Sequence, residues 1–133
     1  MHLIFCVDER DGLSFCGRRL SLDREVYAHI LRLCDGYSLW TTLDSASLFP
    51  EGTVHADEDF LQKAADGDYC FVETLPANEV FQRAESVILY QWNRRYPSTE
   101  KFPRAILSGM RMHQREDFPG NSHELITMER YMP

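Results

Sequence analysis

The residues with the clearest potential for binding chemistry are Trp92, Asn93, Arg94, Arg95 and Tyr96, which directly follow an apolar run. An aromatic face can stack on a planar base, an amide can hydrogen-bond the edge of the base, and a guanidinium can bind phosphate through two parallel hydrogen bonds. This combination is typical of a site for a nucleotide-like anion. The alternative is a half-buried aromatic pair with two arginines over a sheet edge, because such residues are also common on ordinary surfaces.

A second arginine pair, Arg18 and Arg19, stands just before Ser21, which, like Asp23, is a candidate helix N-cap. Helix N-terminal amides and a nearby guanidinium together favour an anion. Successive strand residues point to opposite faces, so only one of the two arginines can face a given pocket. The main hypothesis is therefore a non-catalytic binding protein for a small anionic, nucleotide-like ligand held by both arginine pairs. The alternative is local salt bridges to carboxylates such as Asp8 or Asp23.

A histidine in a polar turn supports a different function. His123 lies between Ser122 and Glu124, shortly after Gly120. A histidine can act as acid or base near neutral pH, as hydrolysis of a phosphodiester requires. Phosphodiester hydrolysis by His123, assisted by Glu124 or Glu73, is thus an alternative function. In the binding hypothesis, Ser122 and His123 are polar contacts of the ligand instead. A solvated or capping histidine is the structural alternative.

The sequence lacks the familiar metal and cofactor motifs. Its histidines form no H-x-H or H-E-x-x-H pattern, and its cysteines form no C-x-x-C. The glycine-rich phosphate loops and the G-x-S-x-G nucleophile turn are also missing. We therefore expect neither a metal nor a cofactor.

Composition limits the class of protein. With 133 residues, of which 44% are hydrophobic, the chain is expected to fold as a single domain over residues 1–133. A formal net charge of -7 argues against binding of bulk DNA or RNA, which depends on many basic contacts to phosphates. The sequence has no membrane-length apolar run, and its cysteines adjoin apolar segments. We expect a cytoplasmic protein with buried free thiols and no membrane partner.

The acidic excess also favours a third function, an inhibitor of a basic host protein. The carboxylates that would form its acidic face are Asp57, Glu58, Asp59, Asp66 and Asp68.

Hydrophobic periodicity and turn signals predict the elements that position these side chains. Strands are predicted at residues 3–7, 13–17, 37–42, 69–73, 86–92 and 105–113, and helices over 22–35, after Asp57 and after Asn78. The Asp11-Gly12 turn predicts a hairpin between the first two strands. Residues 121–131 fit either a helix or a strand. The predicted fold class is α+β, with a mixed or mainly antiparallel sheet and two or three helices. A pocket between the subunits of a homo-oligomer is expected, because a small domain has little internal room for a ligand.

Several segments together resemble a known group of sequences. They are Cys6-Val7-Asp8, Gly17-Arg18-Arg19-x-Ser21-x-Asp23, Ser45-Ala46-x-Leu48-Phe49, Gly67-Asp68-Tyr69-Cys70-Phe71-Val72-Glu73, Trp92-Asn93-Arg94-x-Tyr96-Pro97 and Glu116-Asp117-Phe118-x-Gly120-x-Ser122-His123-Glu124. The resemblance is to a family of short proteins from Clostridia-type bacteria and their mobile elements, some of which are labelled ribonuclease Z. That label implies an H-x-H-x-D-H zinc motif, which this chain lacks. The mobile-element setting is similar in kind to phage sponges of nucleotide immune signals, such as the Thoeris anti-defence proteins, and implies an anti-defence role.

Overall fold

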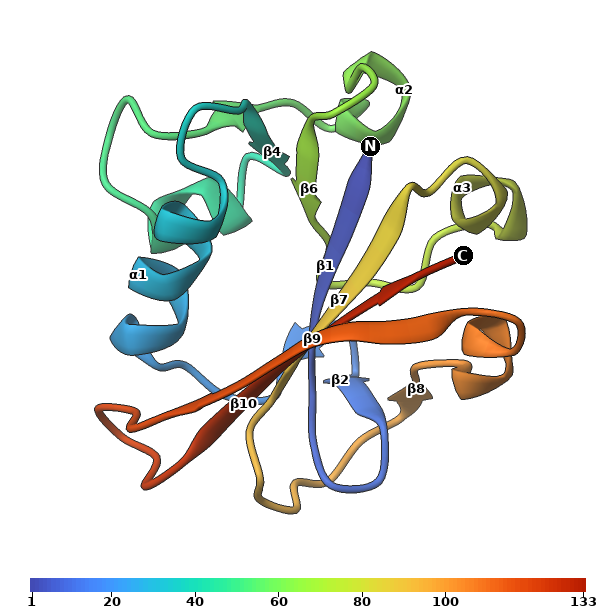
Figure 1. Ribbon diagram of the computed structural model, residues 1–133. Helices are drawn as coiled ribbons and strands as arrows, with labels where there is room; N and C mark the ends of the chain where they lie inside the picture. The colour runs from blue at the N-terminus through green and yellow to red at the C-terminus, as the bar shows by residue number, and fades with distance from the viewer.

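The computed structural model describes all 133 residues, arranged around one seven-stranded sheet (Figure 1). The strands of this sheet, in spatial order, are β5 (His55–Ala56), β4 (Leu39–Thr41), β6 (Tyr69–Phe71), β1 (His2–Val7), β7 (Ser86–Gln91), β10 (Ile126–Met132) and β9 (Arg111–Phe118). A three-stranded sheet contains β3 (Arg18–Arg19), β2 (Gly12–Phe15) and β8 (Glu100–Lys101). The helices are α1 (Arg24–Leu33), α2 (Phe60–Lys63) and α3 (Asn78–Gln82), with 3-10 turns η1 (Ser45–Leu48) and η2 (Arg104–Leu107).

The large sheet is mixed, and its centre is parallel. Strand β1 pairs in parallel with both β6 and β7, so that Leu3 lies opposite Cys70 on one side and Val87 on the other. Strand β4 continues the parallel part, whereas β10 runs antiparallel to β7 and β9. One mixed sheet with three helices confirms the predicted α+β class. The parallel arrangement also places the carboxyl ends of β1, β4, β6 and β7 at one edge of the sheet.

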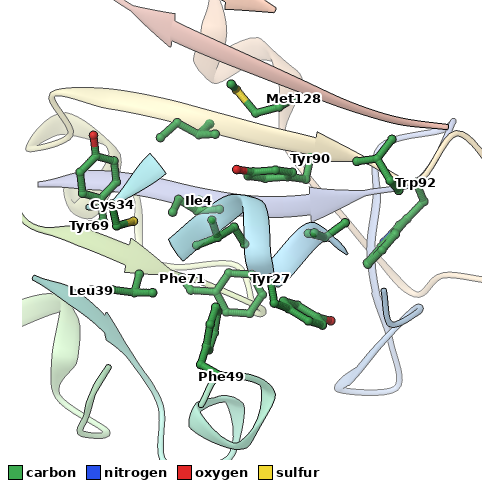
Figure 2. Packing of buried hydrophobic residues seen from close by; sticks show 14 residues of the cluster. Ile4, Tyr27, Cys34, Leu39, Phe49, Tyr69, Phe71, Tyr90, Trp92 and Met128 are labelled. Carbon is green, nitrogen blue, oxygen red and sulfur yellow. The ribbon is translucent and has the colours of Figure 1, made fainter. Parts of the chain in front are cut away.

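Both faces of this sheet are buried, because side chains alternate between two cores. Ile4 and Tyr90 point into the core beneath α1 (Figure 2). Leu3 and Leu89 point into the core on the opposite face. This core is covered by Phe60 of α2, Phe81 of α3 and Leu107 of η2. Figure 1 shows α1 and α3 on opposite sides of the sheet. Continuous apolar runs such as the one in β7 are what a strand buried on two faces requires.

The predicted hairpin between the first two strands is wrong, although strand β1 itself is confirmed. Strand β2 pairs with β3 and β8 in the small sheet and not with β1. The Asp8 carboxylate explains the redirection, because it accepts hydrogen bonds from the amides of Arg10, Gly12 and Tyr96. The chain therefore turns around Asp8 instead of folding back along β1.

The C-terminal third of the structure decides two further predictions, the strand at residues 105–113 and the helix or strand at residues 121–131. The strand predicted at residues 105–113 is wrong, since η2 occupies its first part and Gly109, with a φ of 87°, separates η2 from β9. Residues 126–132 form strand β10, so the terminal segment is a strand and not a helix. The Asn121 amide caps no helix of its own and instead donates to Asp23.

The four cysteines are free. Cys34 and Cys70 are buried as expected, and burial raises the pKa of each of these thiols to about 12. Cys6 is partly buried, whereas Cys16 is exposed, which corrects the expectation that all four are buried. None of the helices has the length and apolarity needed to cross a membrane.

Candidate functional site

The main cavity of the protein has a volume of about 520 Å³ and lies at the carboxyl ends of β4 and β6. Its lining comprises Gly17, Arg18, Arg19, Thr42, Asp44, Ser45, Glu58, Phe60, Glu73 and Thr74. We call it the Arg19–Glu73 pocket. In open sheets with parallel strands, ligands bind outside the carboxyl ends of the strands, where the chain leaves for the next helix. The place of this pocket in the fold therefore favours ligand binding.

A bidentate ion pair occupies one wall of the pocket. Arg19 donates from Nε to Oε2 and from Nη2 to Oε1 of Glu73, each over 2.8 Å. The Ser45 hydroxyl donates to the same Glu73 Oε1. These hydrogen bonds to Glu73 raise the pKa of Arg19. Both oxygens of Glu73 are thus engaged, and the charge of Arg19 is neutralised inside the protein.

The remaining charged groups make the pocket acidic on balance. Its lining holds two guanidinium groups, from Arg18 and Arg19, and three carboxylates, from Asp44, Glu58 and Glu73. The Asp44 side chain is 93% exposed and lies 3.5 Å from Arg19 Nη2. The Arg18 and Glu58 side chains are exposed too. An anion entering this pocket would meet more negative than positive charge.

The structure does not bring the two predicted arginine pairs together. Arg18 and Arg19 line the pocket, but Arg94 and Arg95 do not. The latter two are exposed and follow Asn93, whose left-handed backbone, with a φ of 55°, turns the chain after β7. The Asn93 side chain is itself used within the protein, where it donates to the Leu125 carbonyl oxygen and the Thr127 hydroxyl.

The aromatic residues of the same segment surround His123 instead. The buried Trp92 ring stacks on the His123 ring, with centroids 4.8 Å apart. The Tyr96 hydroxyl lies 2.8 Å from His123 Nε2, and the Ser21 hydroxyl lies 3.2 Å from it. Neither Glu124, which is exposed, nor Glu73, which pairs with Arg19, is a partner of this histidine. The predicted grouping of His123 with these two glutamates is thus corrected.

Sequence reasoning missed the actual partner of His123, the N-cap residue Asp23. The His123 Nδ1 atom lies 2.9 Å from Asp23 Oδ2, and both side chains are almost fully buried. Asp23 also accepts hydrogen bonds from the amides of Asn121 and Ser122 and, at the start of α1, from the amide of Glu25. Burial by itself raises the pKa of Asp23, but the Asn121 amide, the His123 ring and the other donors outweigh it and lower the pKa to about 2. The N-cap role was readable from the sequence, whereas the contact with His123 was not.

This depressed pKa predicts a loss of stability in acid. The pKa of Asp23 falls from 3.8 to about 2 on folding, so the stabilisation is complete above the unfolded value and is lost as the pH falls toward the folded value. Asp23 should therefore contribute about 2 kcal/mol above roughly pH 5, and this contribution should be lost as the pH falls to roughly 2. Urea unfolding across this pH range checks it. The Asp23→Asn variant should show a shallower decline, and an unchanged slope would contradict the assignment.

Comparison with protein-family models and with curated proteins gives no match. Among solved structures, the chain is similar to a dihydrofolate reductase from Enterococcus faecalis complexed with NADP(H) and RAB-propyl. The TM-score is 0.68, the sequence identity is 9%, and the match covers 98% of this chain and 94% of the other. The likeness defines the class of fold: the chain has the fold of dihydrofolate reductase.

This finding corrects the expected functions. A nucleotide-signal sponge, a phosphodiester hydrolase and an acidic host inhibitor were expected, yet nearly the whole chain follows the fold of a reductase that binds NADP(H). The geometry agrees with the correction, because the two arginine pairs do not surround one cavity. The homo-oligomer, the anti-defence role and the cytoplasmic location stay predictions.

Proposed function

We propose that the chain is a small-molecule-binding protein whose Arg19–Glu73 pocket takes a planar ligand that carries N–H donors or a positive charge. The observation that carries the proposal is the bidentate pair of Arg19 with Glu73, which removes the strongest anion-binding group from use. The other charged groups of the lining are Arg18, Glu58 and Asp44, which lies 3.5 Å from Arg19, so two carboxylates and one guanidinium remain exposed to a ligand. A cavity of about 520 Å³ falls within the usual range for small-molecule sites, roughly 300 to 1,000 Å³.

The lining suits an amidine or an aminated heterocycle. An amidinium can donate two parallel hydrogen bonds to a carboxylate such as Asp44, in the strong geometry that guanidinium groups also use. The amide of Leu43 already occupies Glu58 Oε2, which leaves the other oxygen of Glu58 for a ligand. Phe60 supplies an apolar wall for a ring, and Thr74 adds a hydroxyl. The acidic charge of the whole chain, -7, further attracts cations.

The residues present do not fit NADP(H), the cofactor of the similar solved enzyme. A phosphate in the Arg19–Glu73 pocket would meet three carboxylates against two guanidinium groups, and Arg19 could bind it only by giving up Glu73. Breaking such a pair leaves a carboxylate without its partner, which is costly in a partly buried site. The adjoining cavity, between Cys6, Leu20, Val72 and Trp92, holds only about 10 Å³, which is too small for a nicotinamide ring.

An NADP(H)-dependent reductase is the second candidate, favoured by the extent of the match to the solved reductase, 98% of this chain. The two candidate functions differ in what the protein does with NADPH. A reductase binds NADPH and consumes it with a substrate, whereas the proposed binding protein does neither.

Titration calorimetry with benzamidine and benzoate tests the proposal, because the two compounds share shape and differ in charge. We expect benzamidine to bind at least about tenfold more tightly, which corresponds to about 1.4 kcal/mol. The Asp44→Asn/Glu58→Gln double variant should lose that preference, while Asp66→Asn, a change at an exposed carboxylate outside the pocket, should keep it. Tighter binding of benzoate, or of NADPH, would refute the proposal.

A further inference from the structure

A second polar cluster, formed by Ser21, Asp23, Tyr96 and His123, lies outside the Arg19–Glu73 pocket. Its members come from four parts of the chain: the loop after β3, the N-cap of α1, the loop after β7 and the turn before β10. Asp23 is hydrogen-bonded to Nδ1 of His123, and the hydroxyl groups of Ser21 and Tyr96 lie beside Nε2 of the same ring.

The environment of Asp23 sets the tautomer of His123. Asp23 is an acceptor only, because its pKa of about 2 keeps it ionised at neutral pH. Nδ1 must therefore carry the proton that bonds to Asp23, which leaves the lone pair of Nε2 facing Ser21 and Tyr96. A neutral imidazole oriented in this way is a general base aimed at a hydroxyl.

The cluster is held rigidly. Three successive backbone amides, from Asn121, Ser122 and His123, donate to the Asp23 carboxylate. Gly120 permits this approach, since a Cβ atom there would lie 2.6 Å from Asp23 Oδ2. The Trp92 ring stacks on the imidazole with an interplanar angle of 25°. The Trp92 ring and the Asp23 carboxylate together hold the imidazole in one orientation.

We propose that Ser21 is a nucleophile toward small carboxylic esters, with His123 as its base, Asp23 as the positioning residue and Tyr96 as the donor to the oxyanion. The His123 side chain is only 1% exposed, whereas Ser21 and Tyr96 are partly exposed. A substrate that approaches from solvent therefore meets Ser21 and Tyr96 before the His123 ring. The Tyr96 hydroxyl donates to Ser21 Oγ over 3.2 Å, so it is near enough to donate instead to a carbonyl oxygen directed toward it during attack by Ser21.

Ester hydrolysis at this cluster proceeds through an acyl-Ser21 intermediate. A lone pair on Ser21 Oγ forms a bond to the ester carbonyl carbon while the Oγ proton moves to His123 Nε2, and the carbonyl oxygen becomes an oxyanion that accepts from Tyr96. The tetrahedral intermediate then loses the alcohol, which leaves with the proton from Nε2. Water attacks the acyl-Ser21 and gives a proton to Nε2. Return of this proton to Oγ releases the carboxylic acid.

None of the four residues of this cluster lines the Arg19–Glu73 pocket. Ester hydrolysis at the cluster also differs in chemistry from phosphodiester hydrolysis. The reacting centre is a carbonyl carbon, and the nucleophile is a side chain of the protein. The partner of His123 is Asp23, which lies 100 residues away in the sequence.

Labelling with a fluorophosphonate probe followed by peptide mass spectrometry tests the inference. We expect a single adduct on Ser21, and hydrolysis of p-nitrophenyl acetate that falls by at least about 100-fold in Ser21→Ala and in His123→Gln. Tyr96→Phe should lower the acylation rate by about 100-fold, because it removes the oxyanion donor. The matched control is Ser108→Ala, at an exposed serine outside the cluster, which should keep both the label and the hydrolysis.

Folding of each variant is checked by its thermal unfolding curve, and Ser21→Ala removes only one partly exposed hydroxyl. The inference is overturned if the unaltered protein takes up no probe at Ser21, or if ester hydrolysis persists undiminished in Ser21→Ala. Neither outcome bears on the benzamidine titration, which concerns other residues.

Discussion

Replacement of Asp23 by alanine is expected to lower the free energy of unfolding by about 3–5 kcal/mol, because one buried carboxylate accepts several hydrogen bonds at once. The carboxylate, fully buried, is the common acceptor for the His123 ring and for the amides of Asn121 and Ser122. Without it the buried His123 ring N–H has no acceptor, which costs about 1–3 kcal/mol, and the partly buried amides of Asn121 and Ser122 lose theirs as well. Helix α1 also loses its N-cap, worth about 1 kcal/mol.

Urea denaturation followed by circular dichroism measures the effect. Asp23→Asn should be less severe, because the amide oxygen still accepts one of these hydrogen bonds. Asp66→Ala is the control: Asp66 is exposed and takes part in no hydrogen bond or ion pair of the structure, so its removal should change stability by no more than about 0.5 kcal/mol. A loss for Asp23→Ala as small as that of the control would show that the loop before β10 finds other acceptors.

The elements of the parallel core could be predicted from the sequence because their apolar runs have strand length and end at turn signals. Strands β6 and β7 and helix α1 lie within the predicted ranges. Their pairing could not be predicted. Local alternation defines the face to which a side chain points but not the neighbouring strand, so an Asp-Gly turn indicated a hairpin where Asp8 in fact redirects the chain.

The long edge strand β9 shows a different limit. Seven of its eight residues are exposed, from Arg111 to Asp117, so neither face of the strand leaves an apolar pattern to detect. The apolar residues that favoured a strand at 105–113 belong instead to η2, where Leu107 is buried. A prediction based on burial therefore assigned the strand to the apolar segment next to it.

At the candidate site, residue types were predicted but their partners were not. Arg18 and Arg19 do line the main cavity, and Glu73 and His123 are both members of polar clusters. Sequence reasoning joined Glu73 to His123, yet Glu73 binds Arg19, 54 residues away, and His123 binds Asp23, 100 residues away. Such contacts arise from the topology of the sheet, which a single sequence does not encode locally.

The second large effect is expected in the aromatic cluster formed by Phe71, Tyr27 and Phe49. Phe71, 1% exposed at the end of β6, packs edge-to-face against Tyr27 and Phe49, with centroids 6.1 and 5.5 Å away (Figure 2). Each such pair contributes about 0.5–1.5 kcal/mol beyond the area that it buries. The backbone cannot move in to fill the space, because β6 is paired with β1 and β4 and the Phe71 carbonyl oxygen accepts from Thr41. Phe71→Ala should therefore destabilise the protein by about 3–5 kcal/mol.

Chemical denaturation measures the free energy of unfolding of Phe71→Ala and of the control variant Phe15→Ala. The comparison separates the loss of buried packing from the loss of a phenyl ring as such. Phe15 is 46% exposed, so its removal should cost no more than about 1 kcal/mol. Equal losses in the two variants would show that the cluster relaxes around the missing ring. Because Phe71 is followed directly by Val72 and Glu73, a cavity here also loosens the wall that holds the Arg19–Glu73 pair. The preference for benzamidine over benzoate should accordingly weaken in Phe71→Ala and persist in Phe15→Ala.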